Sequence, residues 1–206
     1  MLVLDRKSKG VSEKAKHEKA RIGNQDQTQN RRRNIHPAEA IGSISNMHIW
    51  TINNWEKNLQ NHTYRRSGIR FRYGKGVHPE VKRACSQFAV WLRTQYYFPL
   101  RVVVYVKGTK MIRAKDGENV VGSFFEPLSY LDEPYIRIAT GDYYELTNII
   151  GDDNALASIL LTLAHELTHY YQWINSIQLT PRGLEWQASR YANYILDEYA
   201  LTREHP

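Results

Sequence analysis

The sequence predicts an α+β domain. Its patterns come in the order helix, strands, buried helix and last helix, which is typical of that fold class. The strand segments are short and rich in β-branched residues. The helical pattern that follows them is too apolar for a surface helix. With 206 residues, 42% of them hydrophobic and 24% charged, the chain is long enough to build one core.

A basic tail precedes this domain. Residues 1–33 hold ten Lys or Arg and four Asp or Glu, net +6, whereas residues 34–206 have a net charge of only +1. Because the tail has few large apolar residues, we expect residues 1–34 to be disordered or a fraying helix. Such an arm either binds nucleic acid or an acidic partner, or serves only for solubility. Residues 35–206 are then a single domain with its core at about 79–200.

The first elements are a short helix and a strand. Four apolar residues between 49 and 59 fall at helical spacing, which predicts a short amphipathic helix. Residues 68–74 alternate between glycine boundaries, which predicts a strand. Its arginines form a basic cluster with Arg65 and Arg66, interleaved with aromatic residues. Such a face can stack bases and hold phosphates, but the favoured interpretation is the solvated face of an edge strand.

The next patterns are one helix and three strand segments. Pro79 can begin a helix, and apolar residues recur at three- and four-residue steps until Pro99 ends it. Residues 101–106 are β-branched and predict a strand. Residues 119–125 contain a weaker strand pattern, and Tyr135–Ala139 alternates as a strand does.

Two helices are predicted at the end of the chain. We expect Asp152 or Asp153 to cap a long helix that runs from residue 154 to about residue 173. The Pro-Arg-Gly segment at 181–183 breaks the chain, and a last helix follows from residue 184 to about residue 199.

The long apolar helix contains an H-E-x-x-H motif, His-Glu-Leu-Thr-His at residues 165–169. Residues four apart lie on one helical face, so the imidazoles of His165 and His169 can hold one metal ion. Zinc accepts imidazole nitrogen readily. Glu166 lies beside that face, where its carboxylate can act on a water molecule. The less favoured alternative is a pair of core histidines held by hydrogen bonds, because unpaired buried polar groups are costly.

A hydrolytic zinc site needs a third protein ligand and one open position. The pattern H-E-x-x-H-x-x-G-x-x-H is absent, so the third ligand must come from elsewhere in the chain. Glu185 is the favoured candidate, in the first turn of the last helix, and its alternative role is to complement that helix N-terminus. Small residues share its face and permit close helix approach: Ala188, Ser189 and Ala192. Asp197 and Glu198 are weaker rivals, three turns further on.

The motif, with Glu185-Trp186-Gln187-Ala188 and Tyr191-Ala192 downstream, resembles the gluzincin metallopeptidases. Within them it is similar to the small intracellular group of SprT-like proteins, ImmA/IrrE-like proteins and minigluzincins. The resemblance covers about residues 79–200. It implies a zincin-like fold in which a short mixed sheet packs on the active-site helix and a backing C-terminal helix carries the glutamate ligand. It also implies an upstream edge strand that binds substrate in extended form, for which Tyr135–Ala139 is the match.

Two departures leave the choice between the SprT-like and ImmA-like subgroups open. It lacks the cysteine zinc ribbon that SprT-like proteins often add, and Thr168 stands where ImmA-like proteins usually have glycine. Several tyrosines near the motif could donate to an oxyanion, but a chain with 14 tyrosines singles out none of them. They are Tyr143, Tyr144, Tyr170, Tyr171, Tyr191 and Tyr194.

The expected function is a zinc-dependent metallopeptidase that acts on a protein or peptide. His165, His169 and Glu185 would hold Zn²⁺, and Glu166 would be the general base. The alternative is a non-catalytic zinc-site protein that binds nucleic acid or a partner through its basic N-terminal region.

Cysteine content and hydropathy indicate a cytoplasmic protein. A single cysteine, Cys85, excludes a disulfide framework and a cysteine-based zinc finger. No apolar run approaches the roughly 18 residues of a membrane span. The apolar stretch at the start of the sequence is too short for a signal peptide. We therefore expect no membrane partner.

Overall fold

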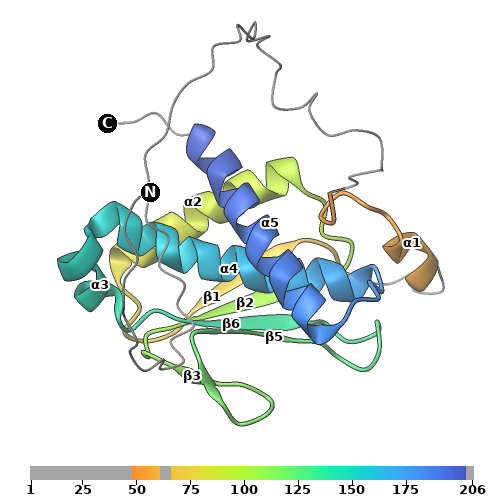
Figure 1. The fold of residues 1–206 in the computed structure, drawn as a ribbon, viewed down its shortest axis with the longest axis horizontal. Helices are drawn as coiled ribbons and strands as arrows, with labels where there is room; N and C mark the ends of the chain where they lie inside the picture. Colours follow the sequence, from red (N-terminus) through yellow and green to blue (C-terminus); the bar gives the residue numbers. More distant parts are fainter. Residues whose placement is uncertain (1–47, 61–65, 203–206) are drawn as a thin grey trace, which may run out of the picture. The chain divides into compact units, whose positions relative to one another are not determined.

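A computed structural model describes residues 48–60 and 66–202 (Figure 1). The predictions for the basic tail and for Arg65 lie outside this part. The described elements, in chain order, are α1 (Trp55–Asn58), β1 (Ile69–Tyr73), α2 (Pro79–Gln95), β2 (Val102–Lys107), β3 (Ile112–Arg113), β4 (Asn119–Val120), β5 (Gly122–Phe125), β6 (Tyr135–Ala139), α3 (Tyr143–Ile150), α4 (Asp152–Ile174) and α5 (Pro181–Leu201).

The fold is mixed, with a short sheet and two long C-terminal helices. Four strands lie in the order β1-β2-β6-β5, in which β1, β2 and β6 are parallel and β5 is antiparallel to β6. The pair β3–β4 forms a separate antiparallel ribbon. Helices α2, α4 and α5 lie on one side of the sheet and the β3 ribbon on the other (Figure 1). Strand β1 is an edge strand with Arg70 and Arg72 exposed, as predicted.

The expectation that Tyr135–Ala139 is the edge strand is wrong. This segment is β6, which lies between β2 and β5 in the sheet. The edge is β5, a four-residue strand that begins with Gly122. A strand this short, with a glycine in it, has too weak a pattern to be recognised as part of the main sheet. Because β5 pairs with β6 in antiparallel fashion, β6 lies inside the sheet and is not the edge strand that the sequence predicts.

Helix α2 forms where proline and the apolar spacing predict it. Pro79 is its first residue, and the side chain of His78 caps it by accepting from the backbone N–H of Glu80 at 3.2 Å. The helix ends at Gln95, before Pro99. Its buried face carries Val81, Ala84, Cys85, Phe88, Ala89 and Leu92.

Helix α4 begins without the predicted aspartate cap. Its N-cap is Gly151, with φ 82°, and no side chain caps the helix; Asp152 and Asp153 lie in its first turn instead. Carboxylates there still complement the helix dipole. The positive φ of Gly151 lets the chain pass directly from α3, a helix not predicted from the sequence, into α4.

Helix α5 begins earlier than predicted. Pro181 and Gly183 do not break the chain but form the first turn, because proline is tolerated at the first helical position. Thr180 caps the helix, since its hydroxyl accepts from the N–H of Gly183 at 3.1 Å. The chain reverses earlier, around Ser176, which has φ 51°. Glu185 consequently lies in the second turn of α5 rather than its first.

The segment before β1 packs against the back of α4. The predicted helix over residues 49–59 is reduced to the single turn α1. The indole N–H of Trp50 donates to Thr168 Oγ1 at 3.0 Å, and the backbone N–H of Trp55 donates to Asn175 Oδ1 at 3.1 Å. These bonds are tertiary contacts with α4, which apolar spacing alone does not record. Across the described residues, no helix is long and apolar enough to span a bilayer.

The α4–sheet contact can be tested at Tyr170. Its buried hydroxyl donates to the carbonyl of Leu100 at 2.7 Å and accepts from the Leu100 N–H at 3.2 Å. Tyr170→Phe leaves both buried backbone groups unpaired, so we expect the free energy of unfolding to fall by about 1–3 kcal/mol in urea titrations. Tyr144→Phe, at a side chain 66% exposed, is the control and should be neutral. Equal unfolding free energies for the two variants would contradict this account.

Candidate metal centre

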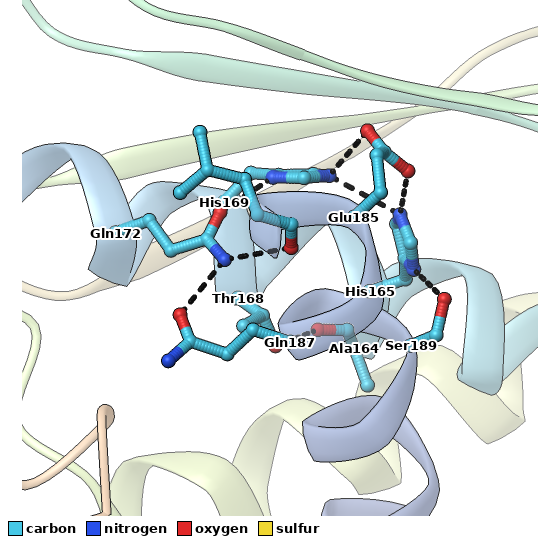
Figure 2. Close-up of polar contacts among 9 residues, drawn as sticks. Ala164, His165, Thr168, His169, Gln172, Glu185, Gln187 and Ser189 are labelled. Carbon is cyan, nitrogen blue, oxygen red and sulfur yellow. Dashed lines mark hydrogen bonds and ion pairs between the residues drawn. The ribbon is translucent and has the colours of Figure 1, made fainter. Parts of the chain in front are cut away.

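Helix α4 presents two histidines on one face, one helical turn apart. Figure 2 shows the imidazoles of His165 and His169 and the carboxylate of Glu185 turned toward one another. The two Nε2 atoms are 3.1 Å apart, and each lies 3.4 Å from an oxygen of Glu185. The structure thus brings together the three residues that the sequence proposed as ligands, with one ligand atom of each within 4.8 Å of the others.

Helix α5 delivers Glu185 because it packs closely on α4. Ala188 and Ala192, three and seven residues after Glu185, are buried with exposed fractions of 0% and 1%. Small side chains at these positions let the two helices approach, as the sequence predicted. The histidine side chains are 16% and 18% exposed and that of Glu185 is 47% exposed, so the cluster opens to solvent on the glutamate side.

The rival third ligands do not join the cluster. Glu198 accepts hydrogen bonds from Tyr96 at 2.7 Å and from Tyr194 at 2.6 Å. Asp197 is exposed on the same part of α5. The candidate ligands among the described residues are therefore the two histidines and Glu185.

The tyrosines that follow the motif also serve other contacts. The hydroxyl of Tyr170 binds Leu100, and that of Tyr171 donates to the carbonyl of Tyr97 at 3.0 Å. Both side chains are buried in the core, and burial raises both pKa values. These two tyrosines therefore stabilise the attachment of α4 to the residues that precede β2.

Gln172 orients His169, a role that the sequence analysis did not anticipate. Its Oε1 lies 2.7 Å from His169 Nδ1. An amide oxygen only accepts, so Nδ1 carries the proton and the Nε2 lone pair is directed toward the cluster. The Gln172 amide donates to the carbonyl of Leu184 at 2.9 Å and to Gln187 Oε1 at 3.0 Å, which ties this residue to α5 (Figure 2). The available signal was its position three residues after His169 on the same helical face.

Thr168 explains one of the departures from the related motifs. Its hydroxyl donates to the carbonyl of Ala164 at 2.9 Å and accepts from the indole of Trp50 at 3.0 Å. The residue is fully buried. Its role is to fasten the segment before β1 to the motif helix.

Glu166 is buried between α4 and strand β5. A Cβ placed on Gly122 would lie 2.7 Å from Glu166 Oε1 and 2.7 Å from Thr162 Cγ2, so only glycine allows this approach. Burial raises the pKa of Glu166, although the two histidines and a hydrogen bond from the Phe124 backbone oppose the rise. A carboxylate whose pKa is raised accepts a proton more readily than an exposed one. A glycine at the start of a strand was the only sequence signal for this contact.

The charges of the cluster favour a cation at its centre. Burial disfavours the charged form of His169, but its hydrogen bond to Glu185 and the charges of Glu166 and Glu185 outweigh burial and raise its pKa. Two imidazole nitrogens and one carboxylate oxygen form a donor set that suits divalent transition metals. The His165, His169 and Glu185 group could therefore hold a metal ion.

Comparisons of the chain with protein-family models, with curated proteins and with solved structures found no significant match. The interpretation of this centre consequently depends on the donor set and on its geometry.

Metal binding distinguishes Glu185 from its rival on the same helix. Glu185→Ala removes one of three ligands and should weaken the binding of a divalent transition metal by at least tenfold in calorimetric titrations, whereas Glu198→Ala should leave it unchanged. A proton and a metal ion compete for His169 Nε2, so affinity should fall as the pH falls through the raised pKa of this residue, above 6.5. A Glu185→Ala protein with wild-type affinity would exclude this ligand set.

Proposed function

We propose that this protein is a zinc-dependent metallopeptidase with a zincin-like fold. The observation that carries the proposal is the convergence of His165, His169 and Glu185 beside a buried glutamate, Glu166, at the edge of a sheet. Zinc held by these ligands would lower the pKa of a water molecule and polarise a carbonyl group.

Glu166 is the proposed general base. It is not among the ligands, and its carboxylate is held between the motif helix and Gly122 of β5. From this position it would take a proton from water and later deliver it to the departing amine. Its raised pKa suits both steps, because the group must be able to hold the proton between them.

The edge strand β5 is the proposed site of substrate alignment. In the described chain it pairs with β6 on one side and with no strand on the other. An extended peptide can add to such an edge through main-chain hydrogen bonds. Because Gly122 of β5 contacts Glu166, a peptide aligned there would pass beside the proposed base. This replaces Tyr135–Ala139, the strand named for this role from the sequence.

Glu166→Gln separates the peptidase from a zinc site without catalysis. The substitution keeps the size of the side chain and all three proposed ligands, so zinc content should stay near one per chain. Hydrolysis of casein or a broad peptide library should fall by about two orders of magnitude or more. The same loss is not expected in the isosteric control Glu118→Gln, at an exposed glutamate just before β4. Undiminished hydrolysis by Glu166→Gln would refute the mechanism, and zinc-loaded wild-type protein without hydrolysis would favour the non-catalytic alternative.

Gly122→Ala tests the contact between β5 and the base. The added methyl group would overlap Glu166 Oε1, so the carboxylate must move. We expect hydrolysis to fall by roughly 10- to 100-fold while zinc content is retained, since misplacing a reacting group is costly even when binding is intact. Ser123→Ala, at the next residue and on the other face of the strand, should change neither. Wild-type activity in Gly122→Ala would show that this contact does not position Glu166.

A further inference from the structure

The face of the sheet away from the helices carries a regular set of side chains. Strand register aligns Arg72 of β1 with Tyr105 of β2 and Arg137 of β6. Alternate residues of a strand point to opposite faces, and the intervening Val104 and Ile136 are fully buried toward the helices. Arg72, Tyr105 and Arg137 therefore form a row across three strands on the opposite face. We call this surface the open face.

Cations and aromatic rings alternate on the open face. The guanidinium of Arg137 lies 4.6 Å from the ring centre of Phe125 and 5.3 Å from that of Tyr135. Those two rings stack at 4.6 Å, with an interplanar angle of 10°. Lys107 Nζ lies 5.4 Å from the ring centre of Tyr105. The rings hold the cations in place through cation–π contacts.

Among the residues that the structure describes, no acidic side chain neutralises the positive charges of this face. The described lysine and arginine ion pairs involve Arg66, Arg83, Arg101 and Lys110, all outside the row. No carboxylate of the described chain lies within 4.0 Å of the charged nitrogens of Arg72, Lys107 or Arg137. A surface of one sign favours an anionic ligand.

A pocket of about 440 Å³ lies between the open face and the β3 ribbon. Its described lining includes Tyr105 and Tyr135 together with three cations, Lys107, Arg113 and Arg137, and contains no acidic residue. Its volume is within the range of small-molecule sites, about 300–1,000 Å³. The pocket can therefore receive a planar ring together with an attached anionic group.

We propose that the open face binds single-stranded nucleic acid, with one base in this pocket and the neighbouring phosphates on Arg72, Lys107, Arg113 and Arg137. Stacking on aromatic rings combined with a positive path for the backbone is the usual basis of single-strand binding. A duplex keeps its bases inside the stack and cannot lay one on these rings. The surface lies on the opposite side of the sheet from the metal centre, so the proposal does not depend on peptidase activity.

The test measures fluorescence anisotropy of a labelled 12-residue thymidine oligonucleotide with the full-length chain. The basic tail can bind the same oligonucleotide through charge, so the decisive variant removes a ring without changing charge. Tyr105→Leu should raise the Kd by tenfold or more. Lys107→Gln should weaken binding several-fold and reduce the slope of log K against log salt by about 0.7.

Matched controls at surfaces away from the open face are Tyr144→Leu and Lys82→Gln, and both should bind as the wild type does. Wild-type binding by Tyr105→Leu and Lys107→Gln would show that the tail alone carries the interaction and would overturn the proposal. Equal affinity for a 12-base-pair duplex, or for polyglutamate of matched charge, would also overturn it in favour of a general anion surface. If Tyr105→Leu does not fold, the single variants Lys107→Gln and Tyr135→Leu are measured instead. The proposal then requires that both weaken oligonucleotide binding, and wild-type binding by both overturns it.

Discussion

Helix α4 must bury an almost continuous apolar surface while it carries the polar groups of the motif, and the rest of the structure depends on how this conflict is resolved. Its apolar side packs against the sheet and α2, and Ile159, Leu163 and Leu167 are buried there. Its polar side is left to α5, whose small residues permit close packing. The two histidines are thereby mostly buried but remain accessible from the side of Glu185. A cation bound there can balance the negative charge of the surrounding carboxylates.

The neighbours of the cluster hold it in place through hydrogen bonds that cross between elements. Gln172 joins His169 to the backbone and side chains of α5. Thr168 joins the same helix to Trp50. Because each of these groups is buried and paired, moving α4 relative to its neighbours would leave polar atoms unsatisfied, and that cost keeps the proposed ligands in register.

The two faces of the sheet differ in chemistry. The helix-side face is apolar, with aliphatic and aromatic side chains against the helices, and its edge at Gly122 contacts the buried Glu166. The open face is cationic and aromatic, with Arg137 stacked on two rings and a pocket beside it. Strand alternation allows both, since each residue of β2 and β6 serves one face only. One short sheet can thus support two separate binding surfaces.

The sequence by itself determined the elements with strong periodicity or proline boundaries, α2, β2, β6 and α4, and the shared helical face of His165 and His169. Both depend on local spacing: four residues place two side chains on one helical face whatever surrounds it. The sequence favoured Glu185 as the third ligand, but this residue joins the histidines only because α5 packs on α4. Tertiary structure alone decided that β5 rather than Tyr135–Ala139 forms the edge, that Gly151 and not an aspartate precedes α4, and that Gln172 and Gly122 support the site. Strand order, helix junctions and supporting contacts join residues far apart in the chain, and their energies depend on packing that no local pattern records.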